Sequence, residues 1–120
     1  MATHNETGKK GELLAHDWLL RNGFSILHHN WRYSHYEIDI IATKEDILHF
    51  TEVKTRRNHR FGFPEEAVSK KKMRSLMLAG EEYLSQNPEW KRVQYNILSI
   101  SLLENEEPRF FLIEDVYGDF

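Results

Sequence analysis

The sequence predicts an α/β sandwich in which helices flank a mixed central sheet, in the order helix, three strands, helix, two strands. Three observations support this fold class. Two segments carry apolar residues at helical spacing, five shorter runs are typical of strands, and the second helical segment lies between the third and fourth strands. We expect the first three strands to form a meander and the second helix to cross over to a further strand.

The first helix is expected to begin at Thr7-Gly8 and to end at a C-cap signal, Asn22-Gly23. Its apolar stripe consists of Leu14, Ala15, Trp18 and Leu19. Glu12 precedes two members of this stripe by three and seven residues, so it lies at or beside the buried face. It could supply a carboxylate to a metal site. The alternative is a first-turn glutamate that the helix dipole favours.

Three strands are expected to follow, at residues 24–31, 37–43 and 47–55, with a polar turn region at residues 32–35. Ile26-Leu27 forms the apolar centre of the first strand. The polar break Lys44-Glu45-Asp46 between the second and third strands is short enough for an antiparallel hairpin.

This predicted hairpin carries acids and a lysine that could surround one point. Alternation along its first strand puts Asp39 on the face of Glu37. The other face of that strand consists of Ile38, Ile40 and Ala42. In the second strand, Glu52 and Lys54 share a face. A loop with an even number of residues brings Asp39 onto the face of Glu52. Asp39 then lies opposite Phe50 with a two-residue loop or opposite Glu52 with a four-residue loop, and both registers are open.

Two carboxylates and an ammonium are the groups that metal-dependent phosphodiester cleavage needs. Mg²⁺ prefers carboxylate oxygens and waters, so Asp39 and Glu52 could hold one ion and leave positions for phosphate. The ion would polarise the phosphoryl oxygen and activate a water, and Lys54 would supply positive charge where negative charge accumulates. The alternative is an exposed salt bridge between Glu52 and Lys54, although the apolar residues around them indicate a strand buried on at least one face.

The second helix has the clearest apolar stripe, which consists of Met73, Leu76, Met77, Gly80, Tyr83 and Leu84. Its start is open between Pro64 and an N-cap at Ser69. With Ser69 as the cap, the lysines at 70–72 occupy a first turn that normally favours acids, and this conflict suggests an anionic partner. Two last strands are expected at residues 93–102 and 109–116, separated by an acidic turn at residues 104–108.

Charge is unevenly distributed along the chain, although the net charge is only −3. Residues 54–74 carry eight basic groups and two acids, whereas residues 104–120 carry six acids and one arginine. The basic groups could bind a phosphate backbone beside the carboxylates, with a solvated charged face as the alternative. They are Lys54, Arg56, Arg57, Arg60, Lys70, Lys71, Lys72 and Arg74. A mobile loop is expected at residues 56–64, where Phe61 and Phe63 either anchor the loop, the reading we favour, or stack on bases.

The composition fits one compact domain over residues 1–120. No window approaches the roughly 20 apolar residues of a membrane span, and no basic-then-apolar leader is present, so we expect a cytoplasmic protein without a membrane partner. The absence of cysteine excludes disulfides and cysteine-based zinc sites. The seven histidines contain no helical His-x-x-x-His pair, which argues against a histidine-bound metal.

Five motifs are found together along nearly the whole chain. They are Gly8-x-x-Gly11-Glu12, Asn30-Trp31-Arg32, Glu37-Ile38-Asp39-Ile40-Ile41-Ala42, Glu52-Val53-Lys54-Thr55-Arg56 and Phe61-Gly62-x-Pro64. With them the chain resembles the YraN-like family of small uncharacterised bacterial proteins. That family is similar to the restriction-endonuclease-like superfamily, whose PD-(D/E)XK motif lies on two strands of the core sheet, with archaeal Holliday-junction resolvases as near analogues. The resemblance implies a restriction-endonuclease-like sandwich. It also implies that Glu12, Asp39, Glu52 and Lys54 correspond to the superfamily's helix carboxylate, motif Asp, motif Glu and motif Lys.

Two positions depart from the family pattern. Tyr36 precedes Glu37 where glycine is common, and Asn96 stands where aspartate is usual. The first substitution would change the approach to the second strand, and the second removes a charge from the fourth strand. Neither alters the expected metal ligands.

These observations lead to a Mg²⁺- or Mn²⁺-dependent endonuclease as the first hypothesis, acting on DNA and, by analogy with the resolvases, on branched DNA. Asp39, Glu52 and Glu12 would bind the metal. A homodimer is an open expectation, because two symmetric cuts need two sites. Two alternatives remain: a nucleic-acid-binding module without catalysis, and a protein-interaction domain that uses residues 110–117.

Overall fold

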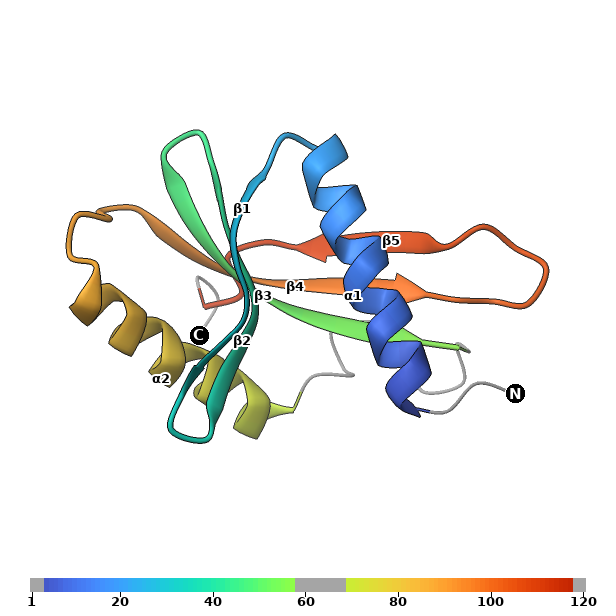
Figure 1. Ribbon diagram of the computed structural model, residues 1–120, viewed down its shortest axis with the longest axis horizontal. Helices are drawn as coiled ribbons and strands as arrows, with labels where there is room; N and C mark the ends of the chain where they lie inside the picture. The colour runs from blue at the N-terminus through green and yellow to red at the C-terminus, as the bar shows by residue number, and fades with distance from the viewer. Residues whose placement is uncertain (1–3, 58–68, 118–120) are drawn as a thin grey trace.

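The computed structural model describes residues 4–57 and 69–117 and confirms the predicted α/β class and element order. The elements are α1 (His4–Arg21), β1 (Ser25–Tyr33), β2 (Tyr36–Lys44), β3 (Ile47–Arg56), α2 (Lys70–Gln86), β4 (Val93–Ser101) and β5 (Arg109–Ile113). The strands form one sheet in the order β1-β2-β3-β4-β5 (Figure 1). Among the described strands, β3 and β4 alone form a parallel pair, and α2 lies on the crossover between them, as predicted.

The two helices cover opposite faces of the sheet. Ile40 and Ala42 pack in one core cluster with Ala15 and Leu19 of α1, whereas Ile41 packs in a second cluster with residues of α2. Neighbouring residues of a strand point to opposite faces, so these contacts place the helices on either side of β2. In Figure 1, β1 and β2 run between the two helices. Within the described ranges, neither helix combines the length and apolar character that a bilayer span requires.

A two-residue turn, Glu45-Asp46, connects β2 to β3. Both residues have left-handed backbone, with φ of 53° and 65°, which is typical of a tight hairpin turn. The ladder runs from Lys44 opposite Ile47 to Ile40 opposite Thr51, and this register aligns Asp39 with Glu52. We expected a two-residue loop to place Asp39 opposite Phe50, and this expectation is wrong. That register needs Lys44-Glu45 as the turn, whereas the observed turn lies one residue later, at Glu45-Asp46.

The side chains of the β1–β2 hairpin switch from one face of the sheet to the other at Asp39. Ile38 packs in the cluster of α2, whereas Ile40, two residues later, packs in the cluster of α1. On β1 the same change occurs between His29, which stacks on His16 of α1, and Trp31, which contacts Tyr83 of α2. The prediction that the apolar residues of β2 share one face is therefore wrong at Ile38.

The cause of the change lies in the backbone of β1. Asn30 falls between the paired positions of this hairpin, across from Asp39, and has a left-handed φ of 50°. A single left-handed residue inside a strand breaks the simple alternation of side chains and increases the local twist. Asp39 therefore lies at the point where the side chains of this hairpin change faces.

Helix α2 begins after Ser69, which resolves the open question of its start. Ser69 is the N-cap, and its side-chain oxygen accepts a hydrogen bond of 3.2 Å from the backbone N–H of Lys72. The first turn contains no acid, so the lysines at 70–72 do oppose the helix dipole. Pro64, Arg60, Phe61, Phe63 and most of the expected mobile loop lie outside the described residues.

Gly11 allows α1 to approach β3 closely. A Cβ at this position would overlap the side-chain hydroxyl of Thr55, whereas a Cβ at Gly8 would meet nothing within 4 Å. Thr55 is β-branched and stiff, so it cannot easily move aside. The spacing between α1 and the end of β3 therefore depends on glycine at position 11.

We expect Gly11→Ala to lower the free energy of unfolding by about 1–3 kcal/mol through overpacking, despite the better helix propensity of alanine. Gly8→Ala is the matched control and should raise the same quantity by up to about 1 kcal/mol. Urea unfolding of both variants measures the difference. Equal effects at the two positions would contradict the close approach.

Candidate metal and nucleic-acid site

Asp39 lies where β2 separates from β3. The last pair of that ladder is Ile40 with Thr51, so the backbone N–H of Val53 has no partner on β2. The Oδ2 atom of Asp39 accepts a hydrogen bond of 2.8 Å from this N–H. The side chain thus replaces a backbone acceptor at the opening between the strands and is held there.

Glu52 lies beside this opening on β3 and faces α2. Its side chain is only 9% exposed, and its Oε1 accepts a hydrogen bond of 3.1 Å from Nζ of Lys72. Lys72 comes from the first turn of α2, and its own side chain is 61% exposed. The three lysines were expected to need an anionic partner, and for Lys72 that partner is Glu52.

The two carboxylates affect one another. Burial raises the pKa of Asp39 to about 8, with repulsion from Glu52 as the next cause, while the hydrogen bond from Val53 lowers it. The pKa of Lys72 is raised as well, because attraction to Glu52 and, more weakly, to Asp39 favours its charged form. The structure therefore joins three groups into one electrostatic unit: Asp39, Glu52 and Lys72.

Lys54 is the third residue of the predicted Glu-x-Lys motif. It follows Glu52 by two positions on β3 and is half-buried. Across residues 4–57 and 69–117, no side-chain hydrogen bond or ion pair engages its ammonium group. The alternative reading, an exposed salt bridge between Glu52 and Lys54, is therefore wrong, and Glu52 pairs with Lys72 instead.

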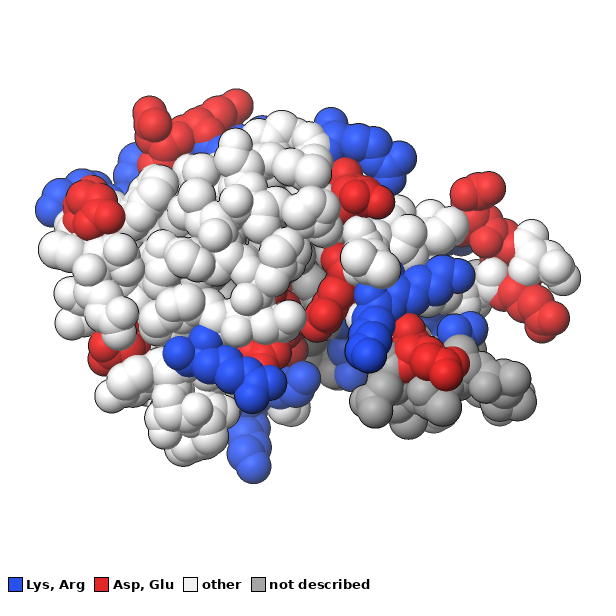
Figure 2. All heavy atoms as spheres, viewed as in Figure 1, with Lys and Arg blue, Asp and Glu red and all other residues white. Residues whose placement is uncertain are grey.

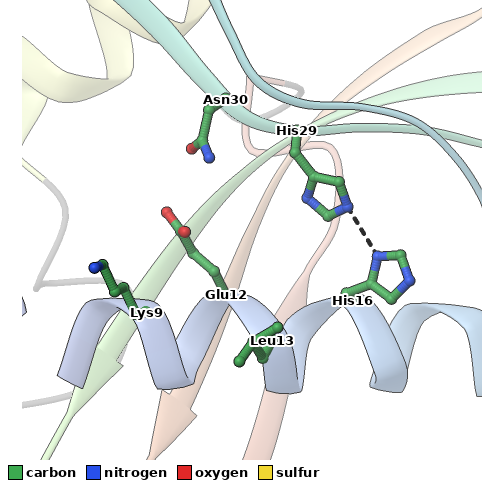
Figure 3. A pocket seen from close by; sticks show the side chains of 6 residues that line it. All are labelled: Lys9, Glu12, Leu13, His16, His29 and Asn30. Carbon is green, nitrogen blue, oxygen red and sulfur yellow. Dashed lines mark hydrogen bonds between the residues drawn. The ribbon is translucent and has the colours of Figure 1, made fainter. Parts of the chain in front are cut away.

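Glu12 lies beside the buried face of α1, as predicted. It lines a cavity of about 470 Å³ with Lys9, Leu13, His16, His29 and Asn30. Figure 3 shows its carboxylate pointing toward Asn30, beside a hydrogen bond of 2.8 Å that joins His16 Nδ1 to His29 Nε2. Because α1 begins at His4, Glu12 is beyond the first turn, and the helix-dipole explanation for it is wrong.

The structure therefore brings together two of the three expected metal ligands. Among the residues it describes, no three histidine, aspartate or glutamate side chains converge well enough to hold a metal ion, so Glu12 does not complete the pair. Asp39 and Glu52 remain a suitable partial ligand set for Mg²⁺ or Mn²⁺, because such ions retain several waters beside one or two carboxylates. Their mutual repulsion is the kind of environment that a divalent cation relieves.

The other described basic residues differ in how far they are exposed. Arg56 is buried, so it is not presented to a phosphate backbone, and Arg57 is exposed while its Nε donates to Oγ1 of Thr7 at 2.7 Å. Lys70, Lys71 and Arg74 are exposed at the start of α2. In Figure 2, Lys and Arg side chains gather over the N-terminal end of α2, with acidic atoms visible among them.

Asn96 has a structural role in the core. Its side chain is fully buried, its Nδ2 lies 2.8 Å from Nδ1 of His49, and its Oδ1 accepts a hydrogen bond of 3.0 Å from the N–H of Asp115. A neutral amide satisfies both contacts without burying a charge. The departure from the family's aspartate therefore connects β3, β4 and the segment after β5.

The C-terminal segment is packed for the most part. Phe110 stacks on Trp18, Val116 is buried, and the hydroxyl of Tyr117 donates to the backbone oxygen of Met73. Phe111 is the large apolar side chain of this segment that remains exposed, at 55%. This packing gives little support to the expected docking surface at residues 110–117.

The raised pKa of Asp39 predicts a pH-dependent stability. A carboxyl whose pKa is higher in the folded state stabilises the fold at low pH and loses that contribution as pH rises from about 4 to about 8. In EDTA, Asp39→Asn should therefore gain at least about 1.4 kcal/mol relative to the parent between pH 5 and pH 8, the equivalent of one pKa unit. Urea unfolding at the two pH values measures this gain. Asp46→Asn, in the exposed turn, is the control, and a similar gain there would contradict the assignment.

Comparison with known proteins places the chain in a family. The profile of the Uncharacterised protein family UPF0102 matches residues 11–111. A UPF0102 protein of Flavobacterium psychrophilum is 39% identical over 120 residues, the full length of both chains. A UPF0102 protein of Phocaeicola vulgatus is 42% identical over all of this chain and 96% of its own, and one of Dictyoglomus thermophilum is 44% identical over 82% of this chain and 85% of its own. The chain therefore belongs to the UPF0102 family, which confirms its resemblance to the YraN-like proteins.

Proposed function

We propose that this protein is a metal-dependent endonuclease that hydrolyses phosphodiester bonds in DNA, with branched DNA as the first substrate to test. The observation that carries the proposal is the placement of Asp39 and Glu52. Two carboxyl groups, each of which disfavours the charge of the other, are held at one half-buried opening in the sheet, where a fold without a use for them would seldom keep both.

The residues at this opening have distinct parts in the proposed reaction. The carboxylates of Asp39 and Glu52 supply oxygen ligands, and the hydrogen bond from Val53 orients the first of them. Mg²⁺ or Mn²⁺, when bound, would supply Lewis acidity and a water of lowered pKa. Lys54 would place its ammonium near the phosphorus as negative charge accumulates there, which is an electrostatic role.

The exposed lysines and arginine at the start of α2 support a nucleic acid as the substrate. Lys70, Lys71 and Arg74 lie on the helix that also delivers Lys72 to Glu52, so a phosphate backbone bound by them would run close to the carboxylates. The net charge of −3 makes this local concentration, and not the whole surface, the binding determinant.

A nucleic-acid-binding module without catalysis is the second candidate. One observation favours it: Lys72 already neutralises part of the acidic site through its ion pair with Glu52. The two candidates differ in a simple outcome, which is whether bound nucleic acid is cut when a divalent cation is added.

The decisive measurement is cleavage of a panel of single-stranded, duplex, flap and four-way-junction DNA, and of RNA, in Mg²⁺ or Mn²⁺ and in EDTA. We expect metal-dependent cutting that falls at least about 100-fold in Asp39→Asn, Glu52→Gln and Lys54→Met. Asp46→Asn, which removes an exposed acid from the same hairpin, should retain full activity. Binding of a substrate without cutting in any metal would instead establish the second candidate.

The salt dependence of binding tests the basic surface separately from cleavage. If Lys71 contacts a phosphate, Lys71→Ala should reduce the slope of log K against log salt by about 0.9 for duplex DNA. Lys91→Ala, beyond the far end of α2, should leave the slope unchanged. Fluorescence anisotropy in Ca²⁺ at several salt concentrations measures both slopes, and equal slopes for the two variants would place the phosphate contacts elsewhere.

A further inference from the structure

Lys72 has a position that the proposed roles do not explain. Its neighbours Lys70 and Lys71 are exposed and project from the first turn of α2, whereas its Nζ reaches across to Oε1 of Glu52 at 3.1 Å. The oxygen that receives this hydrogen bond belongs to a side chain that is 9% exposed. A cation from another part of the chain is therefore inserted into the acidic opening.

The ammonium of Lys72 can be exchanged for another cation at Glu52. The side chain of Lys72 is 61% exposed, so it can leave Glu52 and enter water without crossing packed core. An ion pair with one exposed member is weakly stabilising, whereas a hard divalent cation carries twice the charge and binds the same oxygen directly. Lys72 Nζ already donates to Oε1 at 3.1 Å, so a divalent cation that binds this oxygen meets a positive charge beside it and competes with the ammonium.

We propose that Lys72 is a built-in counter-cation that competes with the divalent metal for Glu52 and is displaced when the metal binds. The inference rests on the proposed function, because it assigns the metal to Asp39 and Glu52. It adds a regulatory property: the protein keeps its acidic opening partly neutralised and weakens its own metal affinity. Metal binding then releases an ammonium group at the mouth of the site.

The ion pair is tested first without metal. In EDTA, urea unfolding of Lys72→Met, Glu52→Gln and the double variant forms a double-mutant cycle. We expect the Lys72→Met change to shift the unfolding equilibrium constant about two- to fivefold more when Glu52 is present than when it is Gln. The same cycle with Lys71→Met should show no such coupling. Absence of coupling at Lys72 would overturn the proposal before any metal is added.

Metal binding is tested next, by calorimetric titration of the full chain with Mn²⁺. We expect Lys72→Met to bind Mn²⁺ about three- to tenfold more tightly than the parent, and Lys71→Met to remain within about twofold of it, since only Lys72 occupies the ligand oxygen. Glu52→Gln should lose the binding. Equal Mn²⁺ affinities in Lys72→Met, Lys71→Met and the parent would overturn the competition.

The outcomes separate this inference from the proposed function. If Lys72→Met binds Mn²⁺ more tightly but no variant cuts nucleic acid, the counter-cation stands and the nuclease fails. If the parent cuts nucleic acid and Lys72→Met has unchanged Mn²⁺ affinity, the nuclease stands and the counter-cation fails. If neither the parent nor Lys72→Met binds Mn²⁺, both are overturned.

Discussion

The hydrogen bond from the N–H of Val53 to the carboxylate of Asp39 connects the architecture of the sheet to its chemistry. Where β2 departs from β3, a backbone donor loses its strand partner, and a buried donor left without an acceptor costs about 1–3 kcal/mol. Asp39 supplies that acceptor from its side chain. The same bond holds the carboxyl beside Glu52, so one interaction both closes the end of the ladder and fixes the spacing of the two acids.

The local charge balance follows from this arrangement. Two acids at a half-buried opening repel one another, and Lys72 of the crossover helix α2 places a positive charge beside them. Since a partly exposed ion pair contributes only about 0–1 kcal/mol to stability, Lys72 matters less for holding the fold together than for setting the charge that an incoming ligand meets. The exposed basic residues at the start of the same helix add positive charge on the surface beside the opening.

The sequence predicts the fold well because the signals are local: helical stripes, strand composition and a short polar break suffice for the order of elements. It also predicts that Asp39 and Glu52 align, in one of two registers. It does not predict that Ile38 and Ile40 face opposite ways, because this depends on the backbone of Asn30 in another strand. The sequence also shows that three lysines at the start of α2 oppose the helix dipole. It does not identify Glu52 as the partner of Lys72, because that contact depends on how the crossover places α2 against β3.

The parallel pairing of β3 with β4 determines the order in which the residues of the site come together during folding. Both acids belong to one hairpin, thirteen residues apart, and can meet as soon as that hairpin closes. Lys72 lies on the connection to β4, so it arrives only when the long-range parallel pairing forms. The early hairpin therefore carries its acidic charge uncompensated, and the step that completes the sheet is also the step that neutralises it.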